Sequence, residues 1–267
     1  MGKITDALKK AAEERLSRIE RLDSQSQGQV KYECIAKKTV ASKIDPRIIA
    51  FYDLHSPVTE QYRKLRTNIQ TLKKDKPIQT VVITSSIHGE GKSITSINIA
   101  ICYSQEAGKK KVLLIDTDMR RSKVHKYLGI DNDIGLADIL ADDRSVDDVL
   151  LNIKEIDNLT VLPAGKTKQN PAELLGSVKF GNLIAALKKR YDYIILDAPP
   201  VIPVTDAALI APHTDGALMV VQASRTQKGV IKHSEDMLKQ AQAKLLGYIL
   251  TNIQYHIPAY VYRYLQK

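Results

Sequence analysis

The chain has 267 residues, a net charge of +10, 43% hydrophobic and 26% charged residues, and only two cysteines. This composition is ordinary for one large globular domain with an appendage. It contains no apolar run of the roughly 18 residues that a transmembrane helix needs, no secretory signal and no CxxC pair, so we expect a reduced, cytoplasmic protein.

The first 56 residues are predicted to form an extension. Apolar residues recur at helical spacing over 3–22, which predicts an amphipathic helix, and residues 23–29 form a polar linker. Residues 30–57 have weak periodicity and are expected to be extended or irregular. Residues 1–76 hold 17 Lys and Arg against 10 Asp and Glu. This excess of positive charge is typical of a solvated helical arm. The functional alternative is a surface that binds an acidic partner or anionic lipid. Because no aromatic residues are interleaved with the basic ones, we expect no nucleic-acid partner.

A globular domain is predicted over residues 57–254. It begins with a helix that starts near Pro57 and ends before Pro77. From residue 78, short apolar runs alternate with helix-length segments: IQTVVITSS, KKVLLIDTD, NLTVLPAG, YDYIILDAPP, DGALMVVQA and LLGYILTNI. Strands that are apolar on both faces and alternate with helices indicate an α/β fold, a mostly parallel sheet covered by helices on both sides.

The segment SSIHGEGKS, residues 85–93, follows the first of these strands and has the features of a phosphate-binding loop. Glycines let the backbone turn its N–H groups around phosphate oxygens, and the lysine and serine suit the β and γ phosphates and Mg²⁺. The pattern departs from the strict motif, because Ser86 stands where the first glycine is expected. The predicted nucleotide contacts are Gly89, Glu90, Gly91, Lys92, Ser93 and Ile94.

Acidic residues follow two of the predicted strands: Asp116 and Asp118 in VLLIDTD, and Asp197 in YIILD. The carboxyl ends of parallel strands share one edge of a sheet, so the three carboxylates should lie beside the loop. We predict that Ser93, Asp118 and Asp197 hold Mg²⁺ with ATP. Asp116 is then a candidate proton acceptor, although the sequence leaves the roles of Asp116 and Asp118 interchangeable. Arg120 is a candidate for neutralising charge on the transferred phosphoryl group, or else a surface arginine.

Together these motifs resemble those of the bacterial tyrosine kinases of polysaccharide synthesis and export. The resemblance covers about residues 57–267 and is closest to the cytoplasmic type, in which the membrane activator is a separate polypeptide. The start MGKITDALKKA is also similar to kinases of exosortase-linked exopolysaccharide clusters. The motifs are GEGKS, VLLIDTDMRRSKVH, LPAGKTKQNPAELL, DYIILDAPPVIPVTDA and a tyrosine-rich C-terminal segment over 255–267.

The resemblance implies a P-loop NTPase fold of the MinD/ParA-like type and autophosphorylation in trans of the C-terminal tyrosines Tyr255, Tyr260, Tyr262 and Tyr264. It also implies a ring-shaped homo-oligomer, with Glu60, Arg63 and Arg66 at the subunit contact. The partners implied are the cytosolic segment of a polytopic activator of the polysaccharide co-polymerase type, which recruits the kinase to the inner face of the membrane, and an antagonistic tyrosine phosphatase.

Two alternatives remain open on the sequence. A MinD/ParA-like ATPase shares the loop and the strand-end aspartates, but it usually has a lysine early in the loop, where this chain has Ile87. It also has no need of a phenol-rich terminus. The second alternative is a nucleotide-dependent scaffold of a polysaccharide export complex, because binding motifs do not prove phosphoryl transfer.

Overall fold

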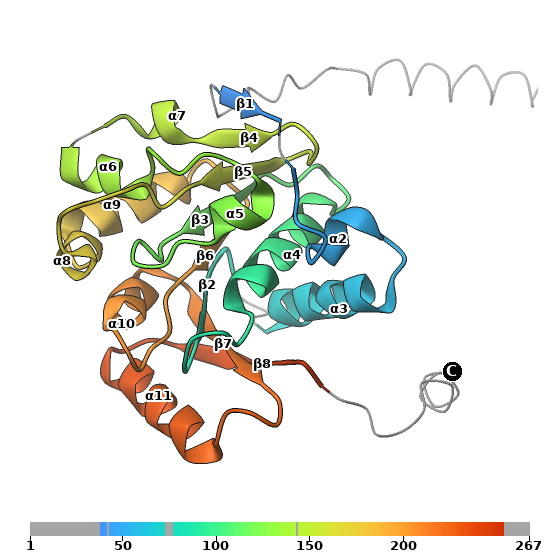
Figure 1. Cartoon of the computed structure of the whole chain (residues 1–267), viewed down its shortest axis with the longest axis vertical. Coiled ribbons are helices and arrows are strands. Elements are labelled where there is room, and N and C mark those ends of the chain that lie inside the picture. The colour runs from blue at the N-terminus through green and yellow to red at the C-terminus, as the bar shows by residue number, and fades with distance from the viewer. Residues whose placement is uncertain (1–37, 42, 73–76, 143, 254–267) are drawn as a thin grey trace, which may run out of the picture. The chain divides into compact units, whose positions relative to one another are not determined.

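The computed structural model describes residues 38–41, 43–72, 77–142 and 144–253. The helix predicted over 3–22, the linker at 23–29 and the tyrosine-rich segment 255–267 lie outside the described residues. Figure 1 shows a central sheet between two layers of helices.

The sheet has eight strands in the order β1-β4-β5-β3-β6-β2-β7-β8 within the described part of the chain. All neighbouring strands are parallel except β4 and β5, so the predicted mostly parallel α/β sheet is confirmed. The strands are β1 Lys38–Val40, β2 Thr80–Ser85, β3 Val112–Asp116, β4 Leu151–Ile153, β5 Leu159–Leu162, β6 Tyr193–Asp197, β7 Gly216–Gln222 and β8 Leu245–Thr251.

Helices cover both faces of the sheet, and each face has its own apolar core. One face is covered by α2 Ile49–Tyr52, α3 Pro57–Thr71, α4 Lys92–Ser104 and α5 Val124–Leu128. The other is covered by α6 Leu136–Asp142, α7 Val146–Val149, α8 Pro171–Leu175, α9 Val178–Leu187, α10 Asp206–Ile210, the 3₁₀ turn Ala211–His213 and α11 Lys228–Gln240.

The strand β3 shows why its sequence is apolar without interruption. Leu113 and Ile115 belong to the core under α9, whereas Val112 and Leu114 belong to the core under α4. Successive side chains of a strand point to opposite faces, so a strand covered on both sides must be apolar at every position.

One local expectation was wrong, and one strand was missed. Residues 38–40 form β1, which agrees with the expected extended backbone, whereas residues 49–52 form the helix α2, and Ile44 and Ile48 are buried in the core. The folded body therefore begins before the boundary predicted at residue 57. The strand β4 was not predicted, because it has only three residues and follows α7 after a single residue.

The strand order places the predicted site. The strand β6 lies between β3 and β2, and Asp116 and Asp197 are opposite each other in the register of β3 and β6. The loop after β2 leads directly into α4 at the same edge of the sheet. The topology therefore brings strand-end carboxylates next to the glycine-rich loop, as the sequence predicts.

Replacing Ser56 by Ala should lower the free energy of unfolding by about 1 kcal/mol, because an N-cap hydroxyl satisfies an otherwise unpaired backbone N–H. The Ser56 side chain accepts a hydrogen bond from the Thr59 N–H at 3.0 Å at the start of α3. Denaturant titration measures the change. The control is Ser145→Ala: Ser145 stands at the N-cap of α7 but makes no capping bond there, so an equal loss in the control would contradict the assignment.

Candidate active site

The glycine-rich loop lies between β2 and α4 and lines an open pocket. Gly89 and Gly91 have φ values of +85° and +92°, in the left-handed region that favours glycine. Gly91 is also the N-cap residue of α4. The pocket is lined by His88, Gly89, Gly91, Lys92, Ser93, Ile94, Asp118, Arg121, Lys123 and Tyr127. A helix N-terminus and turned backbone N–H groups at one end of a pocket are suited to an anion such as phosphate.

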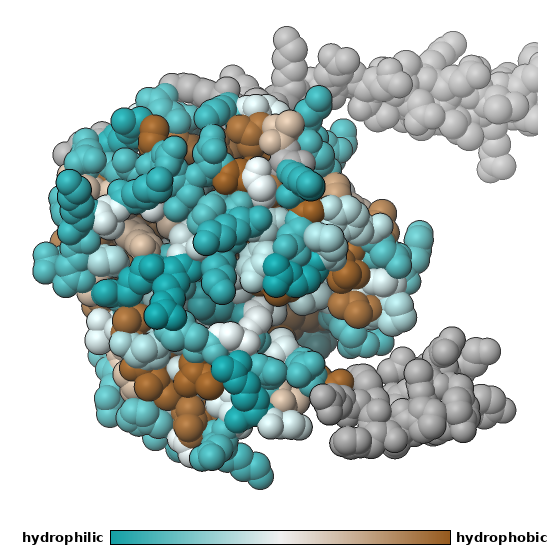
Figure 2. All heavy atoms as spheres, in the orientation of Figure 1, coloured by the Kyte–Doolittle hydropathy of each residue, from teal (hydrophilic) through white to brown (hydrophobic). Residues whose placement is uncertain are grey.

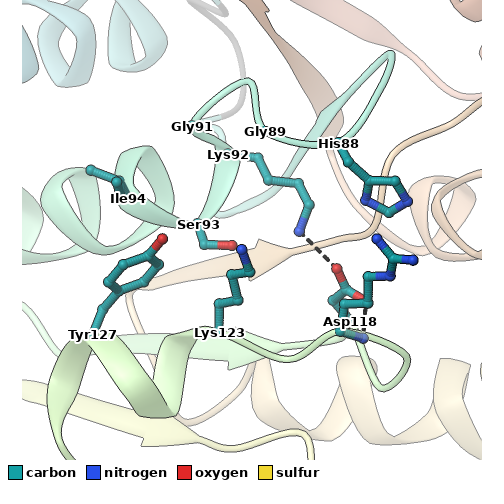
Figure 3. A pocket seen from close by; sticks show the side chains of 10 residues that line it. His88, Gly89, Gly91, Lys92, Ser93, Ile94, Asp118, Lys123 and Tyr127 are labelled. Atoms are coloured by element: carbon teal, nitrogen blue, oxygen red, sulfur yellow. Dashed lines mark hydrogen bonds and ion pairs between the residues drawn. The ribbon is translucent and has the colours of Figure 1, made fainter.

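Lys92 carries the positive charge of the pocket. Its Nζ lies 2.9 Å from Oδ2 of Asp118 and 3.9 Å from Oδ2 of Asp197, and Figure 3 shows the side chain directed at Asp118. Burial alone would lower the pKa of Lys92, but the carboxylates of Asp197 and Asp118 raise it above its ordinary value. The lysine is therefore charged, and it is held by the two carboxylates.

Asp116 holds the segment that follows β3. Its Oδ1 accepts a hydrogen bond from the Asp118 N–H at 3.0 Å, and its Oδ2 accepts bonds from the Ser122 hydroxyl at 2.7 Å and the Val124 N–H at 3.2 Å. Burial raises the pKa of Asp116 to about 7, and the nearby Asp197 carboxylate adds to this effect. Both oxygens thus bond within the segment, whereas Asp118 reaches the pocket.

Asp197 has the features of a residue that faces a cation. The residue is fully buried; its Oδ1 accepts a hydrogen bond from Ser96 at 3.1 Å, and its Oδ2 accepts none from the described residues. Burial raises the pKa of Asp197, and Lys92 acts in the opposite direction. A buried carboxylate oxygen without a donor fits Mg²⁺ or a water molecule bound to it.

Among the described residues, no three His, Cys, Asp or Glu side chains come together as a metal site. Ser93 and Asp118 line the pocket, and Asp197 lies beside it, 3.9 Å from Nζ of Lys92, so these residues form no closed cage. Mg²⁺ commonly keeps several waters and binds through one or two protein groups together with nucleotide phosphates, so an open arrangement fits it.

Arg120 does not line the pocket. Its guanidinium donates hydrogen bonds to Asp206 at 2.8 and 3.0 Å and to Asn170 at 3.3 Å, which fixes it against the start of α10. Two other cations, Arg121 and Lys123, line the pocket instead. Sequence reasoning missed both: the run RRSK shows that cations are present, but only the turn after β3 decides which of them face inward.

His88 and Tyr127 also line the pocket and were not predicted as site residues. Figure 3 shows Lys123 and Tyr127 on the wall opposite the glycine-rich loop, and His88 near Asp118. Burial lowers the pKa of His88, and the nearby Arg121 lowers it further. At neutral pH the ring is therefore uncharged.

The Glu90 side chain lies outside the pocket. Its side chain is 1% exposed and points away from the pocket: it accepts hydrogen bonds from the N–H groups of Ile87 at 3.0 Å and Gln222 at 3.1 Å, and from the Thr226 hydroxyl. A saturated, buried carboxylate cannot contact a nucleotide. Any contact of Glu90 with phosphate must come from its backbone.

The three residues of the predicted subunit contact lie along α3 but have different surroundings. Glu60 and Arg63 form a weak, partly exposed ion pair at 3.4 Å. Arg66 instead donates a hydrogen bond to the Cys102 carbonyl of α4, and its Nε is buried. Of the two arginines, Arg63 is therefore the one whose ion pair, with Glu60, is partly exposed to solvent.

The predicted phosphorylation sites Tyr255, Tyr260, Tyr262 and Tyr264 lie outside the described residues. The strand that leads to them is described, and its last residue, Thr251, donates a hydrogen bond from its hydroxyl to the Glu90 carbonyl at 2.8 Å. The chain thus leaves the sheet beside the phosphate loop.

The sheet order, the loop and the buried Lys92–Asp118–Asp197 cluster define a nucleotide-binding α/β protein of the P-loop class. The model of a family described as AAA domain matches residues 78–246. Tyrosine-protein kinase YwqD of Bacillus subtilis (strain 168) is 36% identical over 214 residues, which cover 80% of this chain and 89% of that relative.

Solved structures agree with this match. The chimerical protein CapA2B2 superposes with a TM-score of 0.74 and 33% identity over 80% of this chain and 93% of that one. The cell division ATPase MinD of Pyrococcus furiosus gives a TM-score of 0.57 and 25% identity over 70% and 78%. The chain belongs to the bacterial tyrosine-protein kinases, and the resemblance inferred from its motifs is confirmed.

The described residues contain no helix long and apolar enough to cross a membrane. The face drawn in Figure 2 is mainly hydrophilic, with apolar side chains in separate small patches.

Replacing Lys92 by Met should cost more stability at about pH 8 than at about pH 6. A carboxyl whose pKa is raised by folding contributes stability that is present at low pH and lost as the pH rises through the folded value. Asp116, with a pKa of about 7, ionises over this range, and burial raises the pKa of the neighbouring Asp197 as well. At higher pH the buried carboxyl groups carry more negative charge, so the folded state depends more on the positive charge of Lys92.

Denaturant titration of the protein without nucleotide or Mg²⁺ at the two pH values gives the comparison. The control is Lys188→Met, which removes the partner of Asp215 at 3.3 Å. Burial favours a higher pKa for Asp215, but hydrogen bonds from Thr80 bring it below the ordinary value, so Asp215 stays ionised throughout. Equal losses at both pH values for Lys92→Met would contradict the prediction.

Proposed function

We propose that this kinase transfers the γ-phosphoryl group of Mg·ATP to tyrosines of its own C-terminal segment, and that it does so between subunits. The observation that carries the proposal is the departure of the chain from β8 at Thr251, which is bonded to the phosphate loop. The 14 residues that follow Ile253, four of them tyrosines, can extend about 45 Å. They can reach a nucleotide pocket in the same or a neighbouring subunit.

The contacts in the pocket support the following roles. The backbone N–H groups of the glycine-rich loop and Lys92 bind the phosphates. Ser93 and Asp197 are the residues that would hold Mg²⁺, which supplies charge neutralisation at the phosphates. Arg121 and Lys123, on the opposite wall, add positive charge where charge develops on the transferred group.

Asp118 is the better candidate for the proton acceptor. In the present structure its Oδ2 is paired with Lys92, and its Oδ1 accepts a hydrogen bond from the Arg121 N–H at 2.9 Å. When Lys92 turns to the phosphates, Oδ2 is released toward the pocket. The phenol oxygen then forms a bond to the γ-phosphorus, the bond to the bridging oxygen of ADP breaks, and the phenol proton passes to Asp118. Asp116 is the alternative acceptor, but its oxygens are already bonded within the 116–124 segment.

The proposed setting is a polysaccharide-export assembly at the inner face of the cell membrane. The protein would form a homo-oligomeric ring, be activated by the cytosolic segment of a polytopic membrane protein of the co-polymerase type, and be reset by a tyrosine phosphatase. Each added phosphate brings a charge of about −1.5 to −2, so a phosphorylated segment would be repelled by bound ATP and leave the pocket. This repulsion links phosphorylation to release of the ring.

Labelled ATP separates this function from the alternatives. Label on protein tyrosine supports the kinase, whereas free phosphate without protein label indicates a partition-type ATPase. If neither product forms, even with the activator segment present, a nucleotide-dependent scaffold remains.

Transfer between subunits is tested by mixing two variants. A Lys92→Met chain with all its tyrosines supplies the acceptor, and an otherwise intact chain that ends at Ile253 supplies the catalytic site. We expect label on the Lys92→Met chain in the mixture and none on either variant alone, measured by phosphotyrosine mass spectrometry at a pH where both are folded. A mixture without label, under conditions where the intact chain labels itself, would show that transfer occurs within one chain.

The subunit contact is tested with two arginines of the same helix. Arg63→Ala should reduce the assembled mass and autophosphorylation but leave the melting temperature nearly unchanged, because its ion pair is partly exposed. Arg66→Ala should lower stability by about 1 kcal/mol, because the Cys102 carbonyl loses its donor. Light scattering and thermal unfolding measure the two effects, with the exposed Lys64→Ala as control. Unchanged assembly in Arg63→Ala would remove this residue from the contact.

A further inference from the structure

The outer side of the glycine-rich loop is bonded to two other parts of the chain. The Arg225 guanidinium donates hydrogen bonds to the carbonyls of His88 and Gly89, both at 3.1 Å. The Thr251 hydroxyl donates to the carbonyl of Glu90 at 2.8 Å. Three consecutive loop carbonyls are therefore held on the side of β7 and β8.

Because the peptide group is planar and trans, the direction of these carbonyls also fixes the direction of the N–H groups that follow them. The carbonyl of one residue and the N–H of the next belong to the same peptide and point to opposite sides. Because the carbonyls of residues 88–90 are bonded outward, the N–H groups of residues 89–91 face the other side, where Gly89 and Gly91 line the pocket. The contacts outside the loop thus decide the orientation of the donors inside it.

The Glu90 side chain completes this attachment. One oxygen accepts from the Ile87 N–H within the loop, and the other accepts from the Gln222 N–H at the end of β7 and from the Thr226 hydroxyl just beyond it. No cation pairs with this buried carboxylate among the described residues. Burying a charge is unfavourable unless strong hydrogen bonds replace its hydration, so these donors are needed to keep the loop in this conformation.

We propose that Arg225, Thr226 and Thr251 are positioning residues for the nucleotide. Arg225 and Thr251 hold the carbonyls of the phosphate loop away from the ligand, and Thr226 holds the Glu90 side chain that anchors the loop. The loop N–H groups therefore face the triphosphate before the nucleotide arrives. The inference rests on the nucleotide binding of the proposed function and assigns a task to residues outside the motif. Since Thr251 ends the strand that leads to the C-terminal segment, the base of that segment is part of the same attachment.

The test measures the affinity of the full-length protein for a fluorescent ATP analogue with Mg²⁺. Thr226→Val removes a hydroxyl bond to a carboxylate with little change in shape, and we expect the dissociation constant to rise about tenfold. Arg225→Gln and Thr251→Val should raise it as well. Thr226→Ser, which keeps the hydroxyl, should restore the wild-type value.

The matched control is Thr80→Val. Thr80 also donates its hydroxyl to a carboxylate, Oδ2 of Asp215 at 2.9 Å, but at the opposite end of β2. It should lower the melting temperature while leaving the dissociation constant unchanged. Wild-type affinity in folded Thr226→Val and Arg225→Gln, or an equal loss of affinity in Thr80→Val, would overturn the proposal.

The outcome is separable from that of the proposed function. The affinity measurement needs no phosphoryl transfer, so it stands even if no label reaches tyrosine. If the wild-type chain labels tyrosine and Thr226→Val binds the analogue normally, the positioning role fails while the kinase function holds.

Discussion

The buried charge at the ends of β3 and β6 is the constraint on which the rest of the structure depends. Asp116, Asp118 and Asp197 are each at most 2% exposed, and Lys92 forms ion pairs with Asp118 and Asp197. Removing an ion from water costs several kcal/mol, and one pair about 4 Å apart recovers roughly 4 kcal/mol at an effective dielectric constant near 20. One lysine therefore cannot offset three ionised carboxylates. The raised pKa values of Asp116 and Asp197 are the consequence, and a divalent cation brought in with the nucleotide would supply the missing positive charge.

The two faces of the glycine-rich loop serve different purposes. The inner face presents N–H groups, Lys92 and Ser93 to the pocket, and the outer face is bonded to the end of β7, the residues just after it and the end of β8. A loop that turns several N–H groups toward a ligand turns its carbonyls to the other side, where they find partners of their own. Here those partners come from segments more than 130 residues away in sequence.

Those parts of the candidate site that are defined by a short local sequence pattern were predictable. The glycine-rich loop, Lys92, Ser93 and the strand-end aspartates belong to this group, because strand ends and loop glycines are visible in the sequence. The inward orientation of Arg121 and Lys123, the pairing of Arg120 with Asp206 and the outward turn of Glu90 were not predictable. The last two depend on contacts with residues about 50 to 140 positions away, whereas Arg121 and Lys123 lie in the turn after β3, where adjacent residues carry no local signal of which one faces inward.

The sequence by itself determined the class of the fold and the family. Uninterrupted apolar strands require helices on both faces, and the glycine-rich loop between a buried strand and a helix requires a phosphate-binding role. Only the tertiary structure decided which charges compensate one another, which of Asp116 and Asp118 reaches the pocket, and how the loop is held. The physical reason is that helix and strand periodicity is set by near neighbours, whereas the energy of a buried charge or carbonyl depends on the donors and acceptors that distant segments bring to it.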